Sequence, residues 1–199
     1  MARPRTFDLD EATDRAMQVF WQHGYEEAGL TELLEAMGIV RGSFYKAFGS
    51  KQALFLRVLE RYDRQVVDGG VALLSDTSRP GPERIALFFS SGLDAARAGD
   101  RRGCLLCNAA SGPVLEDDEV RRAVEAQLMR IAEGFATALE GEIADDAARR
   151  AEANRLLMHY VGLRVLGRGV LDIDAMSDGL RSVIGSRDGW IVHTHDALQ

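Results

Sequence analysis

Side chains that could contact nucleic acid gather just after a glycine in the first quarter of the chain. Arg41, Ser43, Tyr45 and Lys46 all closely follow Gly38. An arginine fork can donate two hydrogen bonds to the edge of guanine, whereas hydroxyl and ammonium groups contact phosphate oxygens. We therefore predict that these residues read and hold DNA.

The spacing of apolar residues predicts a short helix on each side of this glycine. The predicted helices span residues 30–37 and 41–48, and their expected core positions are Leu33, Leu34 and Met37 in the first and Val40, Phe44 and Phe48 in the second. The second helix then has one apolar face and one basic, hydroxyl-bearing face. Two helices joined by a glycine turn form the layout of a helix-turn-helix DNA reader.

The rest of the pattern predicts an all-helical chain. Only four prolines occur, and no run of Val, Ile and Thr alternates as a strand would. Asp8 is the expected N-cap of a helix that ends near His23, and Ser50 is the expected N-cap of a helix over residues 51–74. Residues 75–82, rich in Ser and Pro, mark a boundary. Further helices are predicted over residues 83–98, 118–143, 147–170 and 173–184.

Composition and charge favour a soluble, sequence-specific binder. The 199 residues are 46% hydrophobic and 28% charged, and no uncharged run is long enough to span a bilayer, so we expect a cytoplasmic protein without membrane contact. The net charge is −7, yet residues 38–67 carry six basic against two acidic side chains, and residues 68–199 carry 15 arginines against 21 acids. A basic reader on an acidic body suits a protein that must also release DNA.

Two cysteines form the most distinctive feature of the second half. Cys104 and Cys107 are three residues apart at the expected start of a helix, directly after Arg101 and Arg102. A helix N-terminus and two arginines would lower a thiol pKa, as in a redox or electrophile sensor. Free cysteines are more often small buried core residues, and that is the stronger reading of this pair. Two thiols do not complete a zinc site, with His159 as the only internal histidine to help, so neither a metal nor a cofactor is predicted.

Taken together, these motifs resemble the TetR family of bacterial transcriptional regulators. The resemblance covers residues 10–60 most strongly, through Ala-x-x-x-Phe-Trp-x-x-Gly-Tyr at 16–25, the Met-Gly-Ile turn, and Ser-Phe-Tyr-Lys-Ala-Phe-Gly-Ser-Lys-Gln-Ala-Leu-Phe at 43–55. It implies a DNA-binding helix-turn-helix domain at residues 1–50. It also implies a helical effector-binding and dimerisation domain at residues 51–199, with helix 51–74 as connector and 187–199 as a fraying tail.

The resemblance implies roles for individual residues. The start of the second short helix would read bases, and the residues after it would hold phosphates; the implied DNA contacts are Arg41, Gly42, Ser43, Tyr45, Lys46 and Lys51, with Arg3 and Arg5 entering the minor groove. Many family members carry Ser or Thr where this chain has Gly29, so the side-chain phosphate contact expected there is missing.

The resemblance also implies a homodimer that forms through residues 147–170 and 173–184. This dimer would bind double-stranded operator DNA, and a small-molecule effector would release it from that DNA. The expected effector pocket combines aromatic, thioether, thiol and polar side chains of the central helices: Phe88, Phe89, Cys104, Cys107, Asn108, Met129, Phe135, Met158, His159 and Tyr160. The Gly-Cys-Leu-Leu start at 103–106 is similar to a subgroup in which some members respond to electrophiles through a cysteine there. Release by thiol chemistry at Cys104 or Cys107 is therefore the alternative.

Two other classes of protein are weaker readings. The sequence contains no Ser-His-Asp arrangement, no glycine-rich phosphate loop and no His-Glu-x-x-His motif, so no enzymatic activity is predicted. A helical interaction module that has lost DNA binding would have no need to keep Arg41, Tyr45, Lys46 and Lys51.

Overall fold

The computed structural model describes residues 7–185, and throughout that range the secondary structure is helical, with no strand. The N-terminal half contains α1 (Leu9–His23), α2 (Leu30–Met37), α3 (Arg41–Phe48), α4 (Lys51–Tyr62), a π-helical segment (Asp63–Val67), α5 (Asp68–Ser75) and α6 (Gly81–Arg97). The C-terminal half contains α7 (Leu105–Ala110), a short 3-10 turn (Pro113–Glu116), α8 (Asp118–Ala138), α9 (Asp146–Leu166) and α10 (Ile173–Gly185). The predicted all-α fold class is confirmed.

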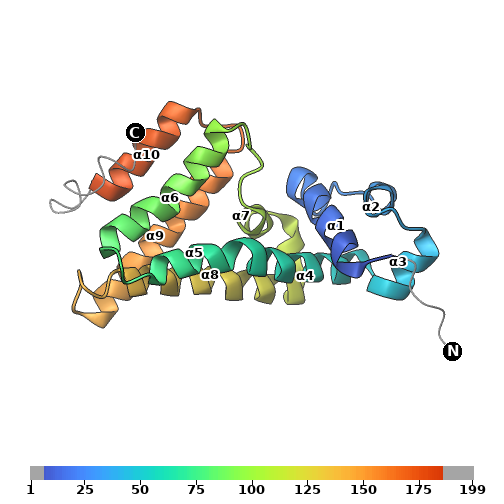
Figure 1. The fold of residues 1–199 in the computed structure, drawn as a ribbon, viewed down its shortest axis with the longest axis horizontal. Coiled ribbons are helices and arrows are strands. Elements are labelled where there is room, and N and C mark those ends of the chain that lie inside the picture. The colour runs from blue at the N-terminus through green and yellow to red at the C-terminus, as the bar shows by residue number, and fades with distance from the viewer. Residues whose placement is uncertain (1–6, 186–199) are drawn as a thin grey trace.

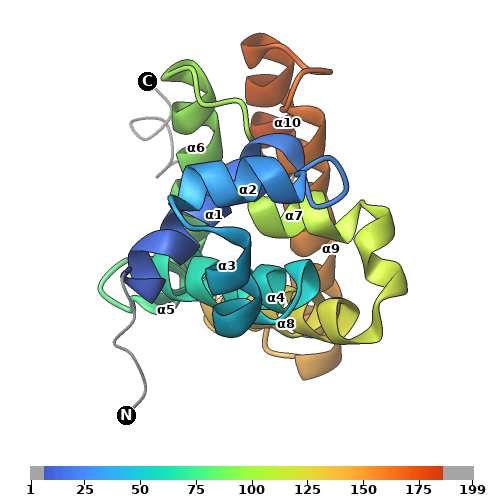
Figure 2. The ribbon, with the colours of Figure 1, turned by 90° about the vertical axis from the view of Figure 1, so that its right-hand side faces the viewer.

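The helices are arranged as an elongated molecule with a small N-terminal cluster at one end. In Figure 1, α1–α3 gather at the right, α6, α9 and α10 lie at the left, and α4–α5 and α8 run between the two ends. Figure 2 faces the end that carries α1–α3. The short helix α7 contacts α1 on one side and α8 and α9 on the other, so it links the two ends through the middle of the molecule.

Local chemistry explains the N-terminal cluster. The Asp8 carboxylate accepts hydrogen bonds from the first backbone N–H groups of α1, and α1 ends at Gly24 with φ +83°. Gly38 ends α2 in the left-handed conformation, at φ +69° and ψ +31°, which is the tight turn between the two short helices. The predicted helices 30–37 and 41–48 are confirmed. Their core is aromatic and aliphatic, built from Phe20, Leu33, Phe44, Phe48 and Phe55.

Val40 is one correction to the predicted core. The helix α3 begins at Arg41, and Val40 is its N-cap with an extended backbone, so the Val40 side chain does not join the stripe of Phe44 and Phe48. It is 71% exposed, whereas both phenylalanines are buried.

The predicted connector helix over residues 51–74 is a continuous helical rod, but it is not a regular α-helix. Ser50 caps α4 by accepting a hydrogen bond from Ala53 N, as predicted. The five residues Asp63–Val67 then widen into a π-helix before α5 resumes the α-helical pitch. Single π-turns inside α-helices often mark functional sites.

Helices α6, α8 and α9 pack around an aromatic cluster. The rings of Phe88 and Phe89 on α6 each lie 5.0 to 6.2 Å from those of Phe135 on α8 and Tyr160 on α9, and 6.2 Å from each other. The predicted helix 118–143 ends earlier, at Ala138, and the helices predicted over 83–98, 147–170 and 173–184 are confirmed with shifted ends. No helix within residues 7–185 is long and apolar enough to cross a membrane.

Candidate nucleic-acid interface and internal cavity

The N-terminal turn of α3 presents its polar side chains away from the core. Arg41, Gly42 and Lys46 are exposed and Tyr45 is 48% exposed, while Ser43 is half-buried. The Arg41 guanidinium lies 5.9 Å from the centre of the Tyr45 ring. The opposite face of α3 is anchored by buried phenylalanines, so this polar face has a fixed orientation.

The lysine that opens α4 is held more closely. Lys51 Nζ lies 3.4 Å from the Glu26 carbonyl oxygen and 4.6 Å from the centre of the Tyr25 ring. Burial lowers the pKa of Lys51, and the nearby Glu26 carboxylate partly opposes that effect. These contacts place the ammonium group beside the loop between α1 and α2; the N-cap of α2, Gly29, provides no side-chain hydrogen bond.

A cavity of about 390 Å³ lies in the other half of the molecule, against the π-helical segment. Helices α4–α6, α8 and α9 and the start of α7 supply its lining: Tyr62, Gln65, Val66, Val67, Gly69, Gly70, Leu73, Phe88, Ser91, Cys104, Ile131, Tyr160 and Arg164. Most of this wall is apolar. Polar groups collect at one place, where Tyr62, Cys104, Tyr160 and Arg164 meet. An apolar cavity with a few convergent polar groups is the usual form of a small-molecule site.

The two thiols at this polar place have opposite acidities. The Cys107 thiol and then the Tyr62 hydroxyl, which lies 3.4 Å from Cys104 Sγ, stabilise the Cys104 thiolate by hydrogen bonding and lower the pKa of Cys104 to about 5. The hydrogen bond to Cys104 and burial raise the pKa of Cys107. Cys104 is therefore the more acidic thiol of the pair.

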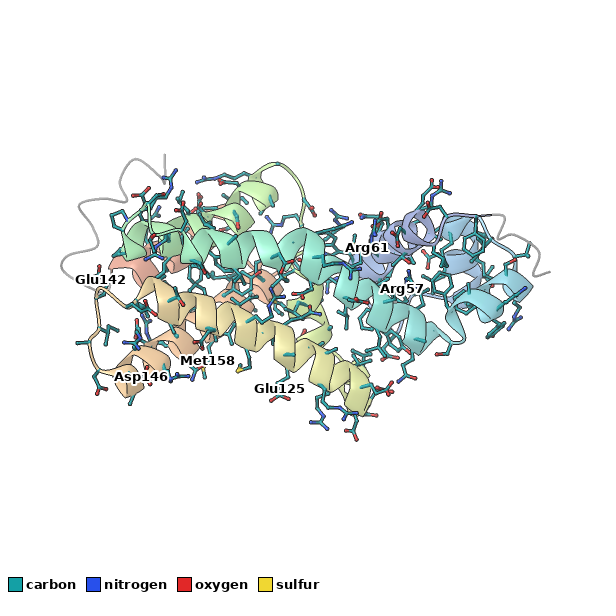
Figure 3. The ribbon with its side chains drawn as sticks, turned by 60° about the horizontal axis from the view of Figure 1, so that its bottom comes forward. Arg57, Arg61, Glu125, Glu142, Asp146 and Met158 are labelled. Carbon is teal, nitrogen blue, oxygen red and sulfur yellow. The ribbon has the colours of Figure 1, made fainter. Side chains whose placement is uncertain are left out.

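A single carbonyl oxygen joins the cavity to the N-terminal cluster. Gly103 O accepts a hydrogen bond from Trp21 Nε1 of α1 at 3.2 Å and another from Arg164 Nη2 of α9 at 2.7 Å. The Trp21 ring also packs edge-on against Tyr62, with ring centres 5.1 Å apart. Helix α1 is fixed to α4 as well, because Arg61 makes a bidentate pair with Asp14 at 2.5 and 2.6 Å, close to Arg57 in Figure 3.

Comparison with known proteins assigns this architecture to a family. Residues 12–58 match the family model described as bacterial regulatory proteins, tetR family. The HTH-type transcriptional repressor BdcR of Escherichia coli (strain K12) is 32% identical over 148 residues, which are 74% of this chain and 70% of BdcR. The uncharacterized HTH-type transcriptional regulator YezE of Bacillus subtilis (strain 168) is 29% identical over 188 residues, which are 89% of this chain and 95% of YezE.

A solved structure gives the same result over nearly the whole chain. A cysteine mutant of the TetR family transcriptional regulator CifR, in complex with 26-bp double-strand operator DNA, is 31% identical and superposes with a TM-score of 0.80. The match covers 92% of this chain and 99% of that one. The chain belongs to the TetR family. It is a DNA-binding transcriptional regulator.

Several residues predicted to form the effector pocket of this TetR-family regulator do lie together. Phe88, Cys104 and Tyr160 line the cavity, and Phe89 and Phe135 pack directly behind Phe88 in the aromatic cluster. Cys107 is buried as the hydrogen-bond partner of Cys104.

The other four residues predicted to line the pocket do not line this cavity. Asn108 lines a separate hollow beside α1, and its amide donates to the Arg102 carbonyl. Met129 is 49% exposed, Met158 is 72% exposed and points to the surface in Figure 3, and His159 is exposed. The apolar or aromatic character of Met129, Met158 and His159 suggested that they point inward. The buried faces of α8 and α9 are instead formed by other residues of these helices.

The arginines that precede the cysteines do not act on the thiols as predicted. Arg101 donates to the Leu171 carbonyl at 2.6 Å, and Arg102 pairs with Asp100 at 2.7 Å and stacks over Trp21. The guanidinium that faces both thiols is that of Arg164, which the sequence analysis missed. Its available signal was a lone charge inside the apolar run 161–166.

Arg3 and Arg5, predicted to enter the minor groove, and the predicted tail at 187–199 lie outside the described residues.

Proposed function

We propose that this regulator is a homodimeric repressor, released from a palindromic operator when a small molecule enters the 390 Å³ cavity. The observation that carries the proposal is the rod formed by α4, the π-helical segment and α5. One end of the rod holds Lys51 beside the reading helices, and residues from Tyr62 onward line the cavity. A ligand in the cavity therefore touches the same element that supports the DNA reader.

For DNA contact, residues 1–50 act as the reader and residues 51–199 as the effector-binding and dimerisation domain. Arg41, with Gly42 and Ser43, reads base edges in the major groove, while Tyr45, Lys46 and Lys51 hold phosphates and Arg3 and Arg5 enter the minor groove. The exposure of the first turn of α3 supports these roles. Val40 adds a contact of its own, because an exposed apolar side chain beside Arg41 suits the methyl group of thymine.

The dimer forms through α9 and α10. Supporting this interface, Met158, Leu166 and Val170 on or just after α9 are large apolar residues exposed at 72%, 42% and 75%. Operator binding requires two reading helices about one helical turn apart, roughly 34–36 Å. An effector that favours a dimer with a different spacing lowers operator affinity, and DNA lowers effector affinity by the same factor.

Thiol modification is the second candidate for the releasing signal. It is favoured by one specific observation, the low pKa of Cys104 in the wall of the cavity. In that mechanism the Cys104 thiolate adds to an electrophilic carbon, a C–S bond forms, and the product takes its proton from solvent.

One experiment tests the repressor proposal and separates the two signals. Binding of the purified protein to DNA from its own upstream region is measured by gel shift with and without N-ethylmaleimide or diamide, for wild type, Cys104→Ser and Cys107→Ser. If the reagent releases the wild-type protein from DNA but not Cys104→Ser, the releasing signal acts through the thiol. If all three proteins stay bound to DNA, the releasing signal is a non-covalent ligand. If the wild-type protein binds no upstream DNA, the proposal is rejected.

A further inference from the structure

One buried cation in the cavity has no carboxylate in an ion pair with it. Among residues 7–185 no carboxylate forms an ion pair with Arg164, and its buried Nε has no hydrogen-bond partner. Within the same residues the hydrogen bond that Arg164 makes is from Nη2 to the neutral Gly103 carbonyl. An arginine keeps its charge even when buried, and a buried charge is unfavourable unless it is both paired and fully hydrogen-bonded. The Cys104 thiol is the acid nearest in kind to a counter-ion, and the hydrogen bonds of the guanidinium are incomplete.

The backbone makes room for this guanidinium. A Cβ atom placed on Gly92, inside α6, would lie 2.4 Å from Arg164 Nη1 and 3.2 Å from its Cδ. Glycine within a helix costs about 1 kcal/mol relative to alanine, so α6 gives up stability where the arginine passes. This position is a built site for the guanidinium rather than an accidental burial.

Neutral hydrogen-bond donors surround the cation. Burial raises the pKa of Tyr160 and of Tyr62 well above the usual tyrosine range, so both phenols remain protonated. Within the described chain the Tyr160 hydroxyl has no hydrogen-bond partner. The titratable groups that act most strongly on Arg164 are these two phenols and the two thiols. The nearest carboxylate that acts on it, Asp100, pairs with Arg102 instead. The rest of the lining is mostly apolar, with Phe88 and Ile131 among its walls and Gln65 and Ser91 as its other polar side chains.

We propose that the cavity binds an organic monocarboxylate, whose carboxylate pairs with Arg164 and accepts a hydrogen bond from Tyr160 while its hydrocarbon body lies along the apolar wall. The regulatory meaning of this ligand rests on the repressor function proposed above, but its binding does not. The site offers one positive charge and one set of donors, so a bound carboxylate competes with the Cys104 thiolate for both.

Binding at Arg164 has a route to the DNA reader. The guanidinium shares the Gly103 carbonyl with Trp21, so a carboxylate that draws the guanidinium toward itself disturbs the hydrogen bond of Trp21. The indole of Trp21 is thereby a reporter that requires no DNA. The second tryptophan, Trp190, is removed by Trp190→Phe so that the fluorescence comes from Trp21 alone.

The test measures binding to the full-length protein in the absence of DNA. Hexanoate, decanoate and phenylacetate are compared with the amide of each by calorimetry and by Trp21 fluorescence. We expect carboxylates to bind and amides to bind more weakly. Arg164→Gln should weaken the carboxylates roughly 10- to 100-fold and leave the amides unchanged, as for a lost charged hydrogen bond. The control Arg122→Gln removes an exposed arginine of α8 and should match wild type.

Three results would overturn the inference: amides that bind as tightly as carboxylates, no binding by any carboxylate, or full carboxylate affinity in Arg164→Gln. Should that variant fail to fold, Arg164→Lys keeps the charge without the fork and should weaken carboxylate binding selectively.

Gel shift with the same compounds separates this inference from the proposed function. Carboxylates that bind without releasing the operator contradict the repressor mechanism alone, whereas release by neutral compounds only contradicts the carboxylate site alone.

Discussion

At the scale of single residues, the reading surface divides into groups that recognise bases and groups that hold the backbone. Arg41 is exposed at the first turn of α3, and Lys46 projects from its last turn. Replacement of Arg41 by alanine should remove roughly 1–3 kcal/mol of discrimination between operator and random DNA. The same change at Lys46 should weaken both DNAs alike and reduce the salt dependence of binding. Competition binding on the two DNAs measures both, and an equal loss on both for Arg41→Ala would disprove its role in base reading.

The acidity of Cys104 leads to a prediction about pH. A thiol with a pKa of about 5 is already ionised at neutral pH, so alkylation of Cys104 by iodoacetamide should reach its maximal rate below neutral pH. Tyr62→Phe removes one donor to the thiolate, which raises the pKa of Cys104 and moves that rise toward higher pH. Mass spectrometry of the alkylated peptides separates Cys104 from the weakly reactive Cys107. A wild-type rate that still climbs through pH 8, like that of an ordinary thiol, would contradict the assignment.

Sequence alone placed some of these residues and missed others for physical reasons. Arg41 and Lys46 follow from the helix period, because one face of a short helix must be apolar. Val40 was misplaced because a residue just outside a helix does not share the helix's period. Arg164 could not be paired with the thiols, because it is brought to them by packing between α7 and α9, far apart in the chain.

At the scale of elements, the π-helical segment and α5 shape one wall of the cavity. Gly69 and Gly70 are adjacent in α5 but differ in surroundings: a Cβ on Gly70 would lie 2.7 Å from the Phe88 ring, and a Cβ on Gly69 would meet nothing within 4 Å. Gly69→Ala should therefore raise the free energy of unfolding by up to about 1 kcal/mol. Gly70→Ala should lose that gain to overpacking of about 1–3 kcal/mol and should narrow the cavity.

Denaturant unfolding of the two variants checks this pair, and each serves as the control for the other. Equal stabilisation by both alanines would mean that Phe88 moves freely away from α5. The wall is then not rigid enough to transmit a ligand's presence.

The spacing of apolar residues predicted the ends of the short helices but not the irregular turn in the long one. Helices 30–37 and 41–48 were predicted with the ends that the structure has, because glycines flank them: Gly29 is the N-cap of α2, and Gly38 and Gly49 are the C-caps of α2 and α3. The π-helical segment was not predicted. A helix with one widened turn keeps apolar residues at near-helical spacing on both sides, so the sequence pattern continues through it.

At the scale of the whole molecule, large apolar side chains are exposed on α9 and just after it. Met158→Glu places a charge in the proposed dimer interface, so it should produce a monomer with strongly reduced operator affinity. Ala72→Glu adds the same charge at an exposed position of α5 and should leave the dimer intact. Light scattering after gel filtration gives the mass of each variant. A dimeric Met158→Glu with normal operator binding would exclude this side of α9 as the interface.

The last prediction concerns how the two ends of the molecule communicate. The Gly103 carbonyl is the point at which α1 and α9 share one acceptor, and Trp21 is the only tryptophan among residues 7–185. Trp21→Phe removes the hydrogen bond but retains an aromatic ring beside Tyr62. Operator binding and decanoate binding should each persist when measured alone, because neither the reading face of α3 nor Arg164 is altered.

The coupling between the two binding events should decrease. For wild type, operator DNA should raise the Kd of decanoate, and decanoate should raise the Kd of the operator by the same factor. In Trp21→Phe both factors should fall toward one. If both factors equal those of wild type, the signal travels through the α4–α5 rod alone, and the shared carbonyl only stabilises the fold.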